Sequence, residues 1–167
     1  HPMYRRQRQM CIRDRSIIQS DGQFEFYNIL DEYFEYENEL HEELIRLRNI
    51  IVSQNDLLKN SEELVNLQRK ITVFHAEKIN HILLKSKINI DLIGFHGQTI
   101  FHDPQKKISK QLGDGELLSQ LLKKKVIYDF RQKDIENGGQ GAPLTPIFHY
   151  LLSCLLYTSP SPRDGSE

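Results

Sequence analysis

The sequence is poor in cysteine and has no long apolar run, and both shortages exclude whole classes of protein. Its only cysteines, Cys11 and Cys154, lie in no CxxC pair or other ligand-like spacing. We therefore expect neither a disulfide scaffold nor a thiolate zinc site, which fits a reducing, cytoplasmic compartment. The longest apolar stretches, within residues 147–152 and 155–157, fall far short of the roughly 20 apolar residues that a membrane-spanning helix needs. No membrane span is expected.

The chain also has no large excess of charge of either sign. Lysine and arginine total 22, aspartate and glutamate total 23, and the formal net charge at pH 7 is -1. Nothing in this balance attracts nucleic acid or an anionic membrane surface, so neither is expected as a partner. The length of 167 residues suits one domain with a sizeable core.

Four common signatures of chemistry are missing as well. The sequence contains no GxxxxGK(S/T) phosphate loop, no GxGxxG dinucleotide turn, no GxSxG nucleophile elbow and no HExxH zinc helix. A function therefore has to be argued from less specific clusters of polar residues.

The two ends of the chain differ in composition from the rest. Residues 1–15, HPMYRRQRQMCIRDR, are basic with almost no apolar periodicity, and residues 153–167 form a Ser/Pro/Gly-rich tail. We expect both to be non-native or disordered, because the strings MCIRDR and LLYTSPSPRD resemble translated sequencing-adapter read-through. Both cysteines would then lie outside the natural segment, residues 16–152. A nucleic-acid-binding arm is the alternative interpretation of the basic start.

Between the ends, apolar periodicity predicts a hairpin and two helices. Residues 16–19 and 23–28 have the pattern of two short strands around the turn at Asp21 and Gly22. Apolar residues at helical spacing predict an amphipathic helix over residues 38–53 and a longer one over residues 61–85, with Ser61 as its N-cap.

The second half of the sequence predicts strands on either side of one short helix. Residues 88–95 and 126–130 are rich in β-branched residues and predict strands buried on both faces. Two shorter strands are predicted at 99–102 and 109–112, and Asp114 is expected to cap a helix that ends at the lysines 123–125. A glycine-rich loop follows at 138–143, before an apolar segment at 144–152. This alternation predicts an α/β domain with a mixed sheet and packed helices.

Two polar clusters follow predicted strands, where the ligands of open α/β sheets gather. The first is FHGQT at residues 95–99, and the second is DFRQKD at residues 129–134 with the loop at 138–143. Carboxylates serve as a base or as an anchor for metal-bound water, while imidazole, amide and hydroxyl groups bind ligand hydroxyls. The clusters predict a sugar or nucleotide site. The candidate residues are His96, Gln98, Thr99, Asp129, Arg131, Asp134 and Gln140.

Plainer interpretations of these clusters stay open. A lone histidine at a strand end is often structural, an Asp–Arg pair is often a surface ion pair, and glycines often only turn the chain. Two other functions also remain: a non-catalytic interaction module that docks through residues 38–86, and a metal hydrolase. The hydrolase would take its ligands, which lack the spacing of a helical zinc motif, from His96, His102, Asp103, Asp129 and His149.

At the same clusters the sequence resembles the anhydro-N-acetylmuramic acid kinase family. The resemblance rests on IGFHGQTIFHDP at residues 93–104, QLGDG at 111–115, DFRQKDI at 129–135 and GGQGAPL at 138–144, with Pro146, Phe148 and His149. These motifs occur in order and with family-like gaps. The resemblance spans about residues 16–152. Over the predicted helices it lies in the apolar pattern more than in the identity of single residues.

The resemblance implies an actin-like or hexokinase-like (ribonuclease H-like) ATPase fold of two α/β lobes, of which this chain would be most of the first. Family members use ATP and magnesium. Water opens the 1,6-anhydro bond of the sugar and the released 6-oxygen is phosphorylated, which gives N-acetylmuramic acid 6-phosphate in cell-wall recycling. A cytoplasmic homodimer is also implied.

The resemblance also assigns roles to the candidate residues. Asp129 is assigned to the substrate, or to magnesium through water, and only secondarily to the catalytic base. The residues assigned to the sugar are His96, Gln98, Thr99, Arg131, Asp134 and Gln140.

The sequence departs from the family at two functional segments. Where members carry a Ser-Gly-Thr-Ser-type phosphate loop, residues 10–15 are MCIRDR, so no residue of this chain is assigned to the nucleotide. The Asp-Thr-Gly-Pro-Gly-Asn segment expected to house the family's base does not occur either. We therefore expect the 167-residue chain by itself to bind ATP poorly and to be inactive, and the kinase activity to belong to the full-length parent.

Overall fold

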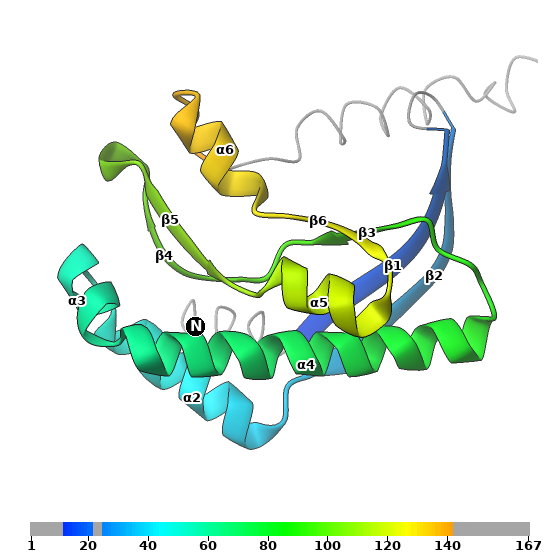
Figure 1. Cartoon of the computed structure of the whole chain (residues 1–167), viewed down its shortest axis with the longest axis horizontal. Helices are drawn as coiled ribbons and strands as arrows, with labels where there is room; N and C mark the ends of the chain where they lie inside the picture. Colours follow the sequence, from blue (N-terminus) through cyan, green and yellow to red (C-terminus); the bar gives the residue numbers. More distant parts are fainter. Residues whose placement is uncertain (1–11, 22–24, 142–167) are drawn as a thin grey trace, which may run out of the picture.

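The computed structural model describes residues 12–21 and 25–141, which form strands and helices (Figure 1). The strands are β1 Ile12–Ser20, β2 Phe26–Glu35, β3 Leu92–Phe95, β4 Gln98–Asp103, β5 Ile108–Leu112 and β6 Lys125–Tyr128. The helices are α2 Asn38–Ile50, α3 Gln54–Lys59, α4 Ser61–Ser86, α5 Gly115–Leu122 and α6 Phe130–Glu136, with the 3-10 turn η1 at Pro104–Lys106. The predicted apolar segment at 144–152 and the tail at 153–167 lie outside the described residues.

The predicted α/β class with packed helices is confirmed, and its strands form small sheets. β1 pairs with β2 and β4 with β5, both antiparallel, whereas β3 and β6 are parallel. Where a mixed sheet was expected, the described strands form three separate two-stranded sheets. The long helix α4 runs along the molecule in Figure 1, and α5 contacts both α4 and β6. The described part of the chain therefore has the α/β class that was expected, without the single mixed sheet.

The β1–β2 hairpin extends further than its sequence predicts. Pairing begins at Ile12 and Glu35 and continues along both strands, with a bulge between Ile17 and Ile18. β1 therefore includes residues 12–15, which belong to the stretch expected to have no folded structure. Main-chain hydrogen bonds to β2 order these residues, and such pairing needs no apolar period in the sequence.

The two predicted helices are confirmed as α2 and α4, and they build the main core. Leu44 and Leu47 of α2 and Leu67 and Ile71 of α4 are completely buried. These side chains pack together with Leu112 of β5 in one apolar cluster. Burial of each such side chain is worth about 1.5–3 kcal/mol. The apolar stripes seen in the sequence are therefore faces that the helices turn toward the rest of the protein, not a free docking surface.

A short helix between α2 and α4 was not predicted. α3 begins after Ser53, whose side chain accepts a hydrogen bond from Asp56 N, while the Asp56 carboxylate accepts one from Ser53 N at 2.9 Å. This capping box satisfies main-chain donors at the helix start. Ser61, the expected N-cap of α4, is instead the first helical residue, because Asn60 occupies the cap position between the two helices.

Strands β3 and β6 are shorter and more exposed than predicted. Leu92 is 49% exposed and Ile127 is 48% exposed, although both were expected in strands buried on two faces. Ala76 of α4 and Leu118 of α5 pack with Phe95 on one side of the pair. The prediction of full burial is wrong for these strands, because an apolar run indicates strand propensity while a second covering layer is a property of the tertiary structure.

The elements that surround the site agree more closely with the sequence. The β4–β5 hairpin forms around η1, and the Asp114 carboxylate caps α5 by accepting a hydrogen bond from Leu117 N at 2.9 Å. The strand predicted at 126–130 ends at Tyr128, since Phe130 already begins α6.

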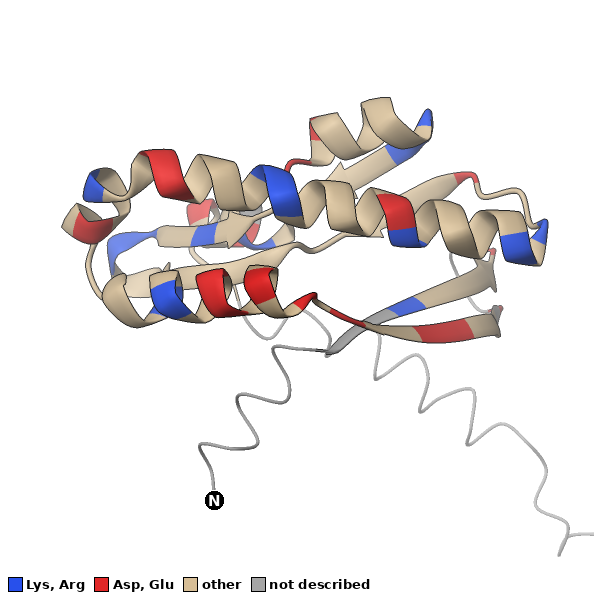
Figure 2. Cartoon of the chain, turned by 90° about the horizontal axis from the view of Figure 1, so that it is seen from below, with Lys and Arg blue, Asp and Glu red and all other residues tan. Residues whose placement is uncertain are grey.

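The described helices carry charges of both signs. Acidic and basic residues are interspersed along α2 and α4 (Figure 2), in keeping with the formal net charge of -1. None of the helices within residues 12–21 and 25–141 combines the length and the hydropathy of a membrane span.

Candidate functional site

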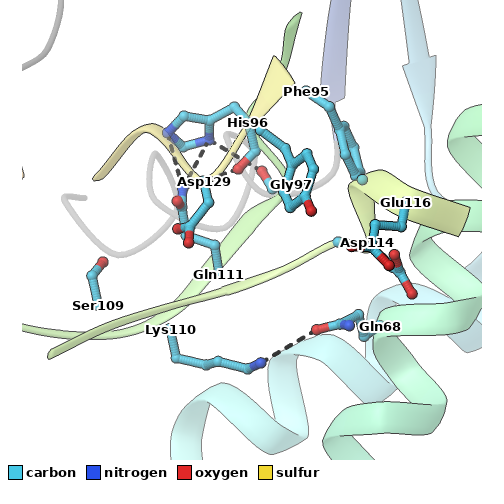
Figure 3. A pocket seen from close by; sticks show the side chains of 13 residues that line it. Gln68, Phe95, His96, Gly97, Ser109, Lys110, Gln111, Asp114, Glu116 and Asp129 are labelled. Carbon is cyan, nitrogen blue, oxygen red and sulfur yellow. Dashed lines mark hydrogen bonds between the residues drawn. The ribbon is translucent and has the colours of Figure 1, made fainter. Parts of the chain in front are cut away.

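The carboxyl ends of β3 and β6 lie side by side, and this brings the two polar clusters together. The strands are parallel, with Phe95 opposite Tyr128, so His96 and Asp129 follow at the same edge. Both residues line a cavity of about 330 Å³ (Figure 3). The structure thus places residues of both predicted clusters at a single cavity.

Residues of α4, β5 and α5 complete the lining of this cavity. They are Gln68, Ser109, Lys110, Gln111, Gly113, Asp114, Gly115 and Glu116, and Phe95, Gly97 and Tyr128 also line it. None of them was a predicted site residue. The QLGDG motif at 111–115 is the signal that points to Gln111 and Asp114. Gln68 lies on a helix far away in the sequence, and no local pattern marks it.

Two glycines allow the cavity's loops to approach each other. Gly97 has φ 67°, and a Cβ there would collide with the carbonyl oxygen of Leu112. Gly113 has φ 145°, and a Cβ there would lie 2.7 Å from the ring of Phe95. Both positions combine a left-handed backbone with close contact, which glycine alone tolerates without strain. The glycines of HGQT and QLGDG therefore hold the loop after β3 against the turn after β5.

His96 is held in one orientation by its neighbours. Arg131 Nε donates to His96 Nε2 at 3.2 Å. A guanidinium only donates, so this ring nitrogen accepts, and the proton is assigned to Nδ1, which lies 3.2 Å from the carbonyl oxygen of Gly97. Gln111 Nε2 donates to the carbonyl oxygen of His96 at 3.0 Å. The ring orientation and the tautomer are thereby both set at the edge of the cavity.

Arg131 and Asp134 act mainly on the chain that follows α6. Arg131 Nη1 donates to the carbonyl oxygen of Gly141 at 2.9 Å, and Gly141 N donates to Asp134 Oδ2 at 2.7 Å. Neither side chain lines the cavity. Arg131 nonetheless links Gly141 of the glycine-rich loop to His96. The cluster at residues 129–134 thus helps to position the cluster at residues 95–99.

Asp129 presents its carboxylate at the cavity from a left-handed backbone conformation. Its φ is 58°, a region that aspartate adopts more readily than most residues. The neighbouring ring belongs to Tyr128, whose pKa is raised by desolvation and by the Glu116 and Asp114 carboxylates. The Tyr128 hydroxyl is thus a neutral hydrogen-bonding group beside the carboxyl side chains of the cavity.

Three predicted site residues lie away from the cavity. Gln98 pairs with Leu112 in the β4–β5 hairpin and is buried, and Thr99 follows it in β4. Gln140 is exposed after α6. None of these three residues is in the lining.

The ligand set considered for a metal hydrolase does not assemble in the described part of the chain. No group of three His, Cys, Asp or Glu side chains close enough to hold a metal ion occurs within residues 12–21 and 25–141. His102 Nδ1 instead lies 3.2 Å from Ser109 Oγ, and Asp103 pairs with Lys106. His149 lies outside the described residues.

The stretch of this chain that matches known proteins includes all the residues that line the cavity. A family model described as anhydro-N-acetylmuramic acid kinase matches residues 14–158. The anhydro-N-acetylmuramic acid kinase of Pelagibacter ubique is 55% identical over 139 residues, which are 83% of this chain and 37% of that protein. The enzyme of the same name from Acidiphilium cryptum is 35% identical over 140 residues, 84% of this chain and 37% of that protein.

A third relative matches a shorter stretch. The protein of this name from Methylobacterium nodulans is 47% identical over 89 residues, which are 52% of this chain and 24% of that protein. The chain thus spans at most about 37% of the length of these three curated relatives. The family match includes both strand-end loops and the turn that lines the cavity, and the chain belongs to the anhydro-N-acetylmuramic acid kinase family.

Proposed function

We propose that the full-length protein is an ATP-dependent kinase that converts 1,6-anhydro-N-acetylmuramic acid and water to N-acetylmuramic acid 6-phosphate in peptidoglycan recycling. This chain supplies the sugar side of the site from part of the first lobe. One observation carries the proposal: His96 and Asp129 line a common cavity at the carboxyl ends of two parallel strands, within the stretch matched by the family.

The lining of the cavity suits a polyhydroxylated ligand. It offers the imidazole of His96, the amides of Gln68 and Gln111, and the carboxylates of Glu116 and Asp129. Such groups donate to and accept from sugar hydroxyls and amides. Gln111 Oε1 is buried and accepts no hydrogen bond from the described residues, which leaves an acceptor unmet at a cost of about 1–3 kcal/mol. A small shift of this amide toward a bound hydroxyl would satisfy it.

We assign the predicted sugar-binding residues to two tasks. His96 contacts the sugar. Arg131 positions His96 through the 3.2 Å hydrogen bond from Arg131 Nε to His96 Nε2. Asp134 and Gln140 act through the loop that ends at Gly141, and Gln98 and Thr99 support the site from β4.

The residues present also fit magnesium held through water. Magnesium keeps several of its waters and takes one or two carboxylates together with substrate phosphates, so a three-ligand protein cage is not needed. Asp129 and Glu116 are two carboxylates that line the cavity. Bound ATP with its magnesium supplies the phosphoryl group. We assign Asp129 to this metal-bound water or to the substrate, and to the base that deprotonates the attacking water only as the second choice.

The proposed activity also implies a cellular compartment and an oligomeric state. A kinase that uses ATP to recycle sugar belongs in the cytoplasm, and the family implies a homodimer. Nucleic acid and membrane lipid are not proposed partners, in line with the interspersed charges along α2 and α4 (Figure 2).

The test is phosphorylation by the full-length protein that contains this segment. With ATP, magnesium and the anhydro-sugar we expect N-acetylmuramic acid 6-phosphate, identified by mass spectrometry. The His96→Ala variant should lose at least about tenfold in kcat/KM, because it removes the imidazole at the cavity edge. His81→Ala is the matched control, since His81 is an exposed residue of α4 that does not line the cavity. An unchanged protein that leaves the sugar unphosphorylated contradicts the proposal.

A further inference from the structure

Lys110 is a lysine inside the cavity whose described partner is uncharged. Its Nζ donates to Gln68 Oε1 at 3.3 Å, a bond drawn in Figure 3, and the residue is half-buried. No carboxylate within residues 12–21 and 25–141 forms an ion pair with it. It is also the one lysine or arginine among the described residues that line the cavity. A half-buried ammonium with only a neutral amide as partner is suited to an anion.

The side chain of Gln68 orients the Lys110 ammonium. Its Oε1 accepts from Lys110 Nζ, and its N–H donors belong to the other arm of the same amide group. Gln68 comes from α4 and Lys110 from β5, on the opposite side of the cavity in Figure 3 from His96 and Asp129. A charged donor held in the lining in this way matches an oxygen of a ligand carboxylate.

The acidic side chains of the lining determine where an anionic group of a ligand can bind. Asp114, Glu116 and Asp129 are carboxylates, and they come from the α5 and β6 side of the cavity. Like charges repel and opposite charges attract most strongly in a partly desolvated site. A ligand with one carboxylate is therefore driven to direct it toward Lys110, which leaves its ring hydroxyls toward His96 and Asp129.

We propose that Lys110, assisted by Gln68, binds the carboxylate of an acidic sugar and makes the site selective for it over a neutral sugar. The inference rests on the proposed function and refines it, since N-acetylmuramic acid differs from N-acetylglucosamine by an ether-linked group that ends in a carboxylic acid. Lys110 is thus a specificity-determining residue, and it takes no part in the chemical step.

Calorimetric titration of the full-length protein without ATP tests this role. The two probes are 1,6-anhydro-N-acetylmuramic acid and 1,6-anhydro-N-acetylglucosamine, which lacks the acid. We expect Lys110→Met to weaken binding of the acid about tenfold and to change binding of the neutral sugar less than twofold. Lys110→Arg should keep most of the preference, and added salt should weaken only the acid. Lys107→Met, at an exposed lysine of the same hairpin outside the lining, is the matched control.

Each alternative outcome separates the two proposals. If Lys110→Met weakens both sugars equally, or neither, or if Lys110→Arg also loses the preference, Lys110 does not select the acid and the inference is overturned. If the unchanged protein binds neither sugar, the proposed function fails and the inference fails with it. Retained binding of the neutral sugar shows that each variant is folded.

Discussion

At the scale of single residues, the site depends on side chains that hold one another. Arg131 donates to the ring of His96, and Gln111 donates to its main chain, so neither group has to touch a ligand to matter. The sequence predicted His96 and Arg131 as parallel sugar contacts. In the structure His96 lines the cavity, whereas Arg131 lies outside the lining and donates to the His96 ring.

Replacement of Gly97 by alanine tests how tightly the cavity's loops are packed. We expect Gly97→Ala to lower the free energy of unfolding of the chain by more than about 1 kcal/mol, because φ is 67° and the new Cβ would collide with Leu112 O. Gly94→Ala is the control, since the nearest atom to its Cβ is Phe130 Cζ at 3.8 Å. Urea denaturation measures the free energy of unfolding of both variants, and equal effects would contradict the close approach of Gly97 to Leu112.

At the scale of elements, periodicity predicted the helices well and the environment of the strands poorly. The stripe of apolar residues in α4 is one long local signal, and the helix follows it from Ser61 to Ser86. The apolar runs of β3 and β6 are equally clear in the sequence, yet their outer residues Leu92 and Ile127 are exposed. An amphipathic helix buries its apolar stripe against whichever element it packs on. A strand is buried on both faces only where a second layer of structure covers the other face of its sheet.

Replacement of Ser53 and of Ser61 tests which of these two serines caps a helix. We expect Ser53→Ala to cost about 1 kcal/mol, because it removes the cap of α3. Ser61→Ala should change stability by less than about 0.5 kcal/mol, since Ser61 is the first helical residue of α4 and not its cap. Urea denaturation of the two variants decides this. The reverse order of effects would restore Ser61 as the cap.

The capping box of α3 also predicts a dependence on pH. Hydrogen bonds, first of all from the Ser53 side chain, hold the pKa of Asp56 below its usual value of 3.8. A carboxyl whose pKa is lower in the folded state stabilises the protein above the unfolded-state pKa, and this contribution is lost as the pH falls through the folded-state value. The stability deficit of Asp56→Ala should therefore be present at neutral pH and shrink at acidic pH below 3.8. A deficit that stays constant between these conditions, followed by urea denaturation, argues against the box.

At the scale of the whole molecule, exposed apolar side chains lie beside the residues of the cavity. The chain spans 37% of the length of its relative from Pelagibacter ubique. Ile127 and Phe130, next to the cavity residue Asp129, are 48% and 38% exposed. Exposed apolar residues beside a polar cavity suit contact with another part of a larger protein.

We predict that the 167-residue chain alone does not turn over ATP with the anhydro-sugar. The Ser-Gly-Thr-Ser-type loop and the Asp-Thr-Gly-Pro-Gly-Asn segment, to which the resemblance assigns the phosphate contacts and the base, do not occur in its sequence. A coupled assay for ADP on the purified chain, with the full-length protein as the positive control, measures this. Turnover by the chain itself would falsify the prediction.

The sequence by itself determined α2, α4 and α5, the two hairpins, the cap at Asp114 and the order of the polar motifs, since each depends on residues within a few positions of one another. Only the tertiary structure decided which of those motifs share a cavity. Parallel pairing of β3 with β6 brings Asp129 to His96, and packing of α4 beneath β5 brings Gln68 to Lys110. Contacts between residues so distant along the chain leave no local period to detect, because they depend on how the whole core packs.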